Sequence, residues 1–213
     1  MQSKPFTFLV NKGWRNNFDR GGTMYAVEAF LNEFTSTDNV QLVIKINSAY
    51  GIPDINKLLE ELRPKDKVDY PRIIMNLDNI PYNQLVNIYN QCHCFVLPSR
   101  AESFGIPILE AGACSLPSIT SDYGGFMDFM DDSLGIIVKG KLEEVKHEVM
   151  YEGVKWNTID INELRKAMRY AYNNQEEMRL KGENAKEKVK KWTWDNSANL
   201  IVNLLEGGID KKF

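Results

Sequence analysis

Apolar residues along this chain fall either in short segments rich in them or in longer stretches with helical spacing. In the first helical stretch Met24, Val27, Phe30 and Phe34 recur three or four positions apart, which predicts one face of an amphipathic helix. The short segments suit strands of a parallel sheet that is covered on both faces. They are residues 6–10, 40–46, 72–75, 95–97, 117–120 and 134–138.

The alternation of these short segments with helical ones predicts the fold class. Pro81 and Pro107 begin two of the helical segments, at a position where the missing N–H of proline has no helical partner to lose. Strands that alternate with helices at this spacing form a parallel sheet with helices on both faces. We therefore predict an α/β fold with a Rossmann-like parallel sheet of about six strands.

The pattern changes after residue 140. Residues 141–157 are amphipathic but match neither period, so they are interpreted as an inserted excursion. Helical spacing then returns over 161–172 and 175–191, and Trp192-Thr193-Trp194 opens a last helix. There is no internal repeat or linker, so residues 1–213 are expected to form a single domain, with 192–206 as its C-terminal helix.

Composition excludes several classes of protein. A net charge of −3 gives no electrostatic footprint for nucleic acid. Three cysteines without a CxxC motif and two histidines predict no metal site, because the side chains of Cys92-His93-Cys94 should face different environments. No segment resembles a signal peptide or a membrane span, which points to the cytoplasm. Six basic and two acidic residues over 179–191 predict a solvated helix face, with peripheral membrane contact at the inner leaflet as the alternative.

Candidate chemistry is found in the loop after the fourth predicted strand. Parallel sheets bind ligands beyond the carboxyl ends of their strands, near the topological switch. Glu102 and Glu110, eight residues apart, bracket a helix N-terminus whose free N–H groups form an anion site. Each carboxylate alone is explained more simply as a charge that complements the helix dipole. Together they predict a ligand built as sugar, diphosphate and ribose.

The loop after the first strand carries a second unusual combination, Arg20-Gly21-Gly22. A cation opposes the dipole at a helix N-terminus, and two glycines forgo helix propensity while allowing close backbone approach. Both features are explained if a phosphate docks there, with Arg15 as a second guanidinium. A solvated basic loop explains the spacing equally well. No GxGxxG motif follows the first strand, which argues against a nicotinamide or flavin cofactor.

Residues 98–120, PSRAESFGIPILEAGACSLPSIT, resemble the signature of the group 1 family of retaining, nucleotide-sugar-dependent glycosyltransferases. The family pattern is PS followed by E-x7-E, here Glu102 and Glu110. Glu28-Ala29-Phe30 and the Trp-Thr-Trp segment also resemble family motifs. The resemblance implies the C-terminal, donor-binding domain of a GT-B enzyme, with a nucleoside-diphosphate sugar as substrate, no cofactor and no metal.

The resemblance also implies roles for individual residues. Glu110 would bind the ribose hydroxyls, Glu102 would contact the transferred sugar, and Arg20 would neutralise the leaving diphosphate. The further residues implied in donor binding are Arg15, Gly21, Ser103, Phe104, Gly105 and Ile106 around the diphosphate, and Asn76 and Leu77 at the base.

Departures from the family pattern keep alternatives open. Ser103 replaces a usual glycine, and Asn47-Ser48-Ala49 stands where a GxG turn is common. A chain of 213 residues has no room for the N-terminal acceptor-binding domain, so we expect a part of a larger enzyme that is inactive on its own. The alternative is a non-catalytic sugar-nucleotide-binding or regulatory subunit with a separate acceptor-binding partner. A sugar-nucleotide epimerase would share the ligand, but it would need a nicotinamide and lacks the E-x7-E block. The nucleotide, the sugar and the acceptor are not encoded in single positions.

Overall fold

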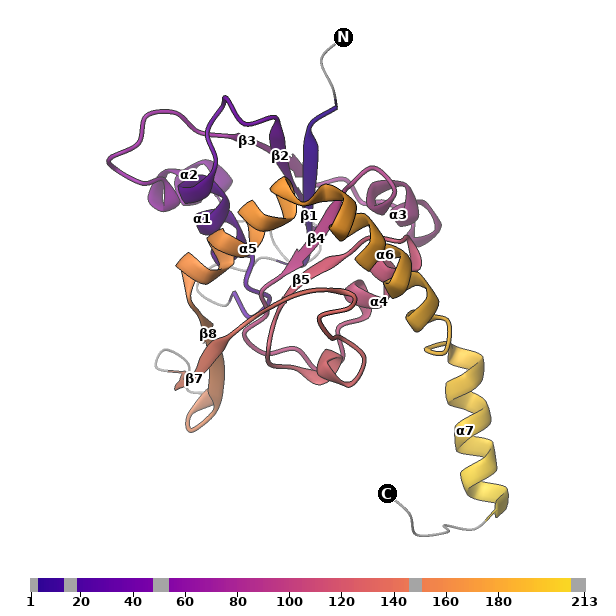
Figure 1. The fold of residues 1–213 in the computed structure, drawn as a ribbon. Coiled ribbons are helices and arrows are strands. Elements are labelled where there is room, and N and C mark those ends of the chain that lie inside the picture. The colour runs from indigo at the N-terminus through magenta and orange to yellow at the C-terminus, as the bar shows by residue number, and fades with distance from the viewer. Residues whose placement is uncertain (1–3, 14–18, 48–53, 146–150, 208–213) are drawn as a thin grey trace.

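The computed structural model describes residues 4–13, 19–47, 54–145 and 151–207. Its centre is a six-stranded sheet in which every pairing is parallel (Figure 1). The strand order is β3-β2-β1-β4-β5-β6, so the predicted α/β fold is confirmed. The strands are β1 (Phe6–Asn11), β2 (Val40–Lys45), β3 (Arg72–Asn76), β4 (Cys94–Leu97), β5 (Ser118–Ser121) and β6 (Gly135–Val138).

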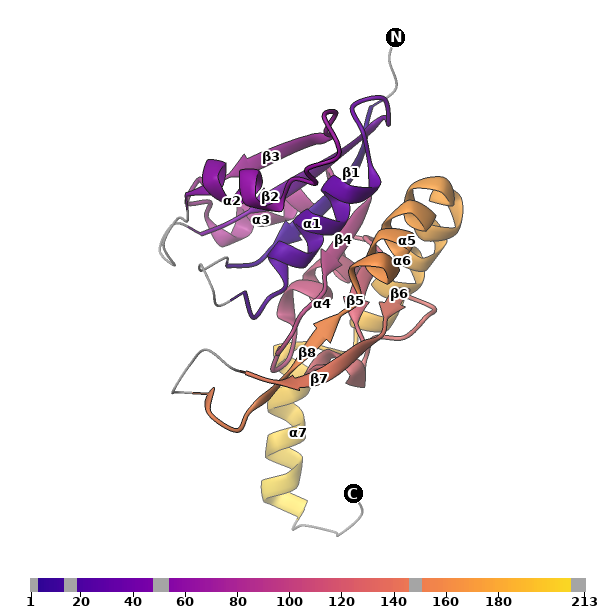
Figure 2. The ribbon, with the colours of Figure 1, turned by 90° about the vertical axis from the view of Figure 1, so that its left-hand side faces the viewer.

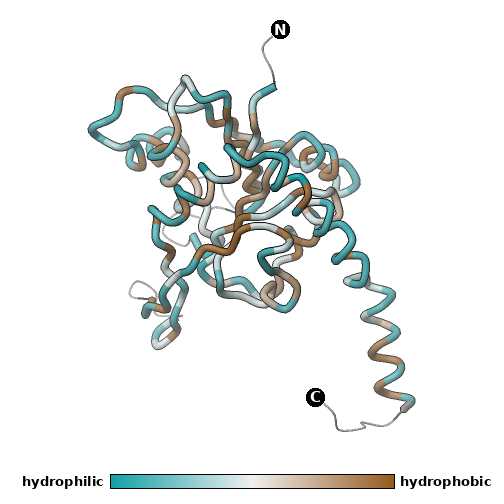
Figure 3. The backbone as a smooth tube through the Cα atoms, in the orientation of Figure 1, coloured by the Kyte–Doolittle hydropathy of each residue, from teal (hydrophilic) through white to brown (hydrophobic). Residues whose placement is uncertain are grey.

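Two apolar cores lie on the two faces of this sheet. In β1, Phe8 and Val10 belong to one core and Leu9 to the other, as the two-residue period of a strand requires. One face packs against α1 (Thr23–Glu33), α2 (Ile55–Leu62) and α5 (Ile161–Asn173). The other packs against α3 (Tyr82–Tyr89), α4 (Ile106–Ala113) and α6 (Gln175–Val189). Figure 2 shows the helices around the sheet, and Figure 3 shows the apolar strands at its centre.

The topology fixes where a ligand could bind. β1 pairs with β2 on one side and β4 on the other, and the chain leaves these two central strands toward opposite faces. The helices that follow β1 and β4 therefore diverge to opposite faces, and the loops between lie at the carboxyl edge of the sheet, which is where open α/β sheets hold their ligands. Both loops carry the residues that the sequence pattern singled out.

The excursion over residues 141–157 contains an antiparallel hairpin of β7 (Gly140–Glu144) and β8 (Lys155–Ile159). Trp156 and Asn157 are its buried residues next to the sheet loops, at 4% and 1% exposure. The guanidinium of Arg100 lies 5.2 Å from the Trp156 ring, and the Asn157 N–H donates to the Arg100 carbonyl over 2.8 Å. Polar and apolar residues do not alternate regularly along this hairpin, which is why the pattern predicted no strands here.

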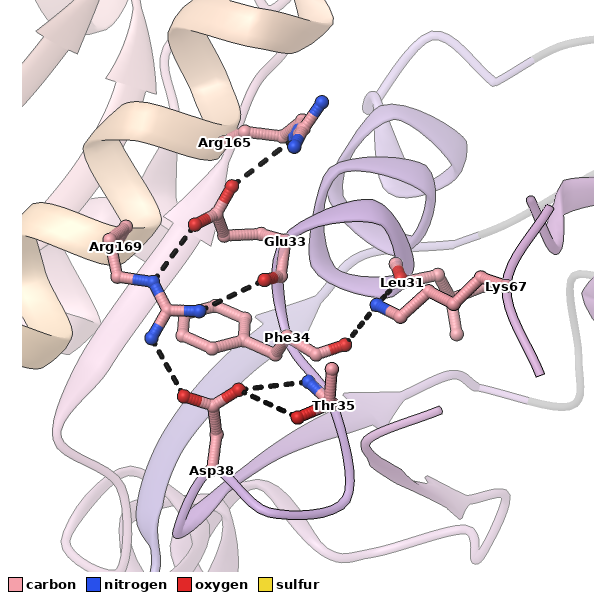
Figure 4. Close-up of polar contacts among 8 residues, drawn as sticks. All are labelled: Leu31, Glu33, Phe34, Thr35, Asp38, Lys67, Arg165 and Arg169. Carbon is pink, nitrogen blue, oxygen red and sulfur yellow. Dashed lines mark hydrogen bonds and ion pairs between the residues drawn. The ribbon is translucent and has the colours of Figure 1, made fainter. Parts of the chain in front are cut away.

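Charged side chains hold α5 against the C-terminal end of α1 (Figure 4). The Arg169 guanidinium donates to the Glu33 carboxylate over 2.8 Å, to Asp38 over 2.7 Å and to the Glu33 carbonyl over 2.9 Å. It also covers the Phe34 ring at 4.2 Å. Lys67 donates to the carbonyls of Leu31 and Phe34 at the same helix end. Cations at a helix C-terminus satisfy its free carbonyls and complement the dipole, so this cluster stabilises the α1–α5 contact.

The last helix, α7 (Trp194–Gly207), projects away from the body of the molecule (Figures 1 and 2). Its apolar side chains are exposed, among them Trp194 at 84% and Leu205 at 80%. Apolar and polar residues alternate along it (Figure 3). Within the described residues, no helix has the length and apolar character that crossing a membrane requires.

Candidate functional site

The loops after β1 and β4 are packed directly against each other. The Arg20 carbonyl accepts hydrogen bonds from the Arg100 N–H at 2.9 Å and from the Ser99 hydroxyl at 3.2 Å. Gly22 has a φ of 77°, and a Cβ there would lie 1.9 Å from the Pro98 carbonyl oxygen. Only glycine fits such a position. The need for glycine at residue 22 therefore comes from contact between the two loops and requires no ligand.

The N-terminus of α1 is capped by a side chain of its own loop. Asp19 is 3% exposed, and its carboxylate accepts from the Thr23 N–H at 2.8 Å and from the Met24 N–H. Burial raises the pKa of Asp19 to about 6, against the opposite effect of these N–H groups and of Arg100. The Asp19 carboxylate thus occupies the place where the sequence interpretation put a phosphate, and those two N–H groups are not free for one.

The N-terminus of α4 is open by comparison. Gly105 precedes the helix with a φ of 86°, and no side chain caps the helix start. Among the described residues, no hydrogen-bond acceptor faces the N–H groups of Ser103, Phe104, Gly105 or Ile106. The loop is fixed from behind, because the Gly125 N–H of the short 3-10 helix Gly125–Asp128 donates to the Glu102 carbonyl over 3.1 Å. Free N–H groups on a fixed loop at a helix N-terminus make an anion site.

Glu102 forms an ion pair with Lys12, a residue that the sequence interpretation left as loop packing. The side chains are 10% and 22% exposed, so the pair is largely shielded from water. Lys12 directly follows β1, and its aliphatic stem packs over Gly21. The sequence feature that could have identified Lys12 is its position directly after a central strand, because that edge of the sheet faces the ligand. The pair brings a cation from the β1 loop against the first carboxylate of the motif.

Glu110, the second carboxylate, accepts hydrogen bonds from two tyrosines of α3. The Tyr82 hydroxyl lies 2.9 Å from Oε1, and the Tyr89 hydroxyl lies 2.8 Å from Oε2. Tyr89 is 2% exposed and accepts from the Asn11 amide at 2.9 Å. Burial, followed by the charge of Glu110, raises the pKa of Tyr89 far above its usual value. Asn11 and Lys12, consecutive residues at the end of β1, thus support Glu110 and Glu102 respectively.

The next three candidate residues are Arg20, Phe104 and Arg15. Arg20 is exposed, and its side chain contacts no partner among the described residues. The Phe104 ring packs against Phe129 and Trp192 at centroid distances of 5.7 and 5.9 Å, so its side chain is structural. The Arg15 prediction lies outside the described residues.

Asn76 and Leu77, predicted at the nucleotide base, are the last residue of β3 and the residue after it, two strands away from β1 in the sheet. The Asn76 side chain accepts from the Asp78 N–H over 3.2 Å, and Leu77 packs against an apolar core. Among the described residues, no hydrogen bond joins either of them to Glu102, Glu110 or the α4 start. Tyr82 and Tyr89 are the residues through which the helix after β3 reaches the motif, and the sequence interpretation assigned neither of them to the site.

Groups that could hold a metal ion are not found among the described residues. His93 Nδ1 accepts from the Thr7 N–H at 3.0 Å, and its ring stacks on Phe6. Cys94 is fully buried and Cys92 only partly, as expected for side chains that face different environments. Burial raises the pKa of Cys92 to about 12, which keeps this thiol protonated and inert.

The family described as glycosyl transferases group 1 matches residues 54–151, which include both motif carboxylates and the start of α4. Over residues 54–151 the chain therefore carries the sequence pattern of the group 1 glycosyl transferases. An uncharacterized glycosyltransferase of Methanocaldococcus jannaschii is 26% identical over 180 residues, 80% of this chain and 45% of that protein. The chain thus spans less than half of the length of this curated relative.

Solved structures show the same fold. The C-terminal domain of the group 1 glycosyl transferase LpcC from Francisella tularensis superposes with a TM-score of 0.64 at 18% identity, covering 88% of this chain and 86% of that one. Anabaena HepE, crystallised with UDP and glucose, gives a TM-score of 0.67 at 14% identity, covering 96% of this chain and 49% of that one. The fold is therefore that of the C-terminal half of GT-B glycosyltransferases, and the resemblance inferred from residues 98–120 is confirmed.

Proposed function

We propose that this group 1 glycosyltransferase domain binds a nucleoside-diphosphate sugar and supports retaining glycosyl transfer when an N-terminal domain completes it. The observation that carries the proposal is the open N-terminus of α4 between Glu102 and Glu110. The unpartnered N–H groups of residues 103–106 are suited to a diphosphate. Glu110 is placed for the ribose hydroxyls and Glu102 for the transferred sugar.

Lys12 is proposed as the cation nearest to the reacting group, with Arg20 at the rim of the site. In transfer, the bond between the anomeric carbon and the phosphate oxygen breaks and the electron pair leaves with the diphosphate. An acceptor hydroxyl oxygen forms the new bond, and its proton passes to the departing diphosphate. Positive charge and fixed N–H groups stabilise the negative charge that develops on that leaving group. The resemblance assigns this work to side chains and helix dipoles, so no metal is proposed.

Support for a second domain comes from α7 and from the relatives. The Anabaena HepE chain is about twice as long as this one, which covers 49% of it. The exposed apolar residues of α7 suit contact with another protein body. Trp194, Leu200, Ile201 and Leu205 are the most exposed of them. A separate acceptor-binding subunit would meet the same requirement, and the donor domain would then act as a binding or regulatory subunit.

The membrane alternative is weakened by the surface of α6. Arg179 pairs with Glu176 and Glu183, and Lys188 pairs with Asp131. The face is thus of mixed charge, and mixed charge attracts an anionic leaflet less than a free basic cluster does. Cytoplasmic placement, with membrane association of the complete protein, stays a prediction.

Calorimetric titration of the chain with UDP, GDP and ADP tests the proposal. One of the three is expected to bind, and Glu110→Gln is expected to weaken it by at least about 1 kcal/mol, the scale of a hydrogen bond to a charged group. Glu177→Gln is the matched control, because Glu177 also accepts from a tyrosine hydroxyl, that of Tyr170, but lies on α6. Absence of binding at millimolar concentration, or equal weakening in both variants, would contradict the proposed site.

A further inference from the structure

Two tyrosines hold Glu110, and they differ sharply in exposure. Tyr89 is 2% exposed, whereas Tyr82 is 75% exposed. Tyr82 nevertheless lies with its hydroxyl 2.9 Å from Glu110 Oε1. The hydrogen bond to Glu110 is also the main cause of a raised pKa at Tyr82. One tyrosine is therefore a fixed part of the site, and the other is a solvent-facing side chain folded onto it.

The position of the Tyr82 hydroxyl is chemically informative. A carboxylate that already accepts from Tyr89 on Oε2 has its free acceptor capacity mainly on Oε1, and Tyr82 takes a place there. A ligand hydroxyl that binds Glu110 would make the same kind of hydrogen bond, with the same donor chemistry. Oε1 keeps a second lone pair, but the phenol that lies against it also occupies the space next to this oxygen, so the phenol and the ligand hydroxyl compete for one place.

Tyr82 can also leave at low cost. It is the first residue of α3, directly after Pro81, and among the described residues its hydroxyl has no partner besides Glu110. Its side chain belongs to neither apolar core. A rotation of this side chain into water would uncover Glu110 without disturbing the helix.

We propose that Tyr82 is a displaceable cover of the ribose subsite, whose hydroxyl stands in for a ligand hydroxyl on Glu110 and must be expelled when the donor binds. The inference rests on the proposed donor function. Its consequence is that the chain binds its nucleotide less tightly than Glu110 and the α4 start would allow. Apparent affinity is reduced by the fraction of molecules in which Tyr82 is away from Glu110.

Tyr82→Phe removes the competing hydroxyl and keeps the ring. We expect it to tighten binding of whichever of UDP, GDP or ADP binds the wild-type chain by about fivefold, the factor that corresponds to about 1 kcal/mol. The 2′,3′-dideoxy form of the same nucleotide should gain nothing, because it brings no hydroxyl to Glu110. Tyr170→Phe is the matched control, since the Tyr170 hydroxyl lies 2.6 Å from Glu177 on an exposed surface elsewhere. Unchanged or weaker binding in Tyr82→Phe would overturn the proposal and make Tyr82 a bystander or a direct ligand contact.

A ligand-free measurement separates this inference from the proposed function. In a chain labelled with ¹³C at the tyrosine ζ carbons, the Tyr82 resonance should titrate at lower pH after Glu110→Gln. If the pH at which the Tyr82 resonance titrates stays the same, the Tyr82–Glu110 contact and the proposed cover are wrong, while the donor site can still be right. If that pH falls but no nucleotide binds either Tyr82→Phe or the wild-type chain, the proposed function is wrong and the cover is wrong with it.

Discussion

Asp19 gives the sharpest test of how the site loops are built. An aspartate that caps an exposed helix normally has a lowered pKa, because the N–H groups and the dipole favour its charged form. Asp19 is 3% exposed, and burial outweighs those effects, raising its pKa from 3.8 to about 6. A carboxyl whose pKa is raised on folding contributes stability at pH values below its unfolded pKa. That contribution is lost as the pH rises through the folded pKa.

The size of the effect follows from the shift. About two pKa units at 1.36 kcal/mol each correspond to about 3 kcal/mol, lost between about pH 4 and pH 7. In Asp19→Asn the side chain cannot ionise, so this loss is absent. The unfolding free energy of the variant minus that of the wild type should therefore rise by about 3 kcal/mol over this range, because all other titrating groups are common to both.

Urea denaturation followed by tryptophan fluorescence at four pH values between 4.5 and 7.5 measures the larger part of this difference, about 2 kcal/mol, because the rest is lost below pH 4.5. Asp54→Asn is the matched control at an exposed cap: Asp54 caps α2, asparagine caps a helix about as well as aspartate, and this variant should change the unfolding free energy by less than about 0.5 kcal/mol. A difference for Asp19→Asn that stays flat or falls with rising pH would refute the reasoning. It would mean that the Thr23 and Met24 N–H groups dominate over burial.

Three further outcomes follow from the contacts. Lys12→Met should weaken binding of the nucleoside diphosphate about tenfold, the scale of one charge-assisted hydrogen bond. Lys57→Met, on exposed α2, is the control and should leave the calorimetric affinity unchanged. Equal affinities of Lys12→Met and the wild-type chain would show that Lys12 is not part of the site. Arg169→Ala should lower the unfolding free energy by about 1–2 kcal/mol in urea, whereas Lys166→Ala, which breaks only an exposed pair, should lower it far less. Similar losses would contradict the role given to the α1–α5 cluster. Tyr89→Phe should destabilise the chain by about 1–3 kcal/mol, because it leaves the half-buried Asn11 amide without this partner and Glu110 with Tyr82 alone. An unchanged denaturation midpoint would argue against that network.

The sheet and its helices could be predicted because their residues follow simple periods. Phe8, Leu9 and Val10 are all apolar, which only a strand buried on both faces explains, and the structure places them in two cores. The hairpin β7–β8 could not be predicted, because it is held by single long-range contacts such as Arg100 on Trp156. Such contacts have no period along the chain.

The site shows the same division between local and long-range information. The α4 start could be predicted, since a helix N-terminus and its N–H groups are local features marked by Gly105 and Pro107. The partners of the two carboxylates could not. Lys12 lies 90 residues before Glu102, and Tyr82 lies 28 residues before Glu110. Arg20 was favoured over Lys12 because its glycine neighbours suggested a phosphate, but Gly22 instead fits against the Pro98 carbonyl of the neighbouring loop.

The central claim is that a nucleoside diphosphate binds at the start of α4. Amide NMR of the ¹⁵N-labelled chain, titrated with the diphosphate that calorimetry selects from UDP, GDP and ADP, tests it most directly. The account predicts that the largest shifts fall on the N–H groups of Ser103, Phe104, Gly105 and Ile106, and that the Thr23 and Met24 N–H groups, already bonded to Asp19, shift little. Largest shifts at Thr23 and Met24, or away from the carboxyl edge of the sheet altogether, would contradict it.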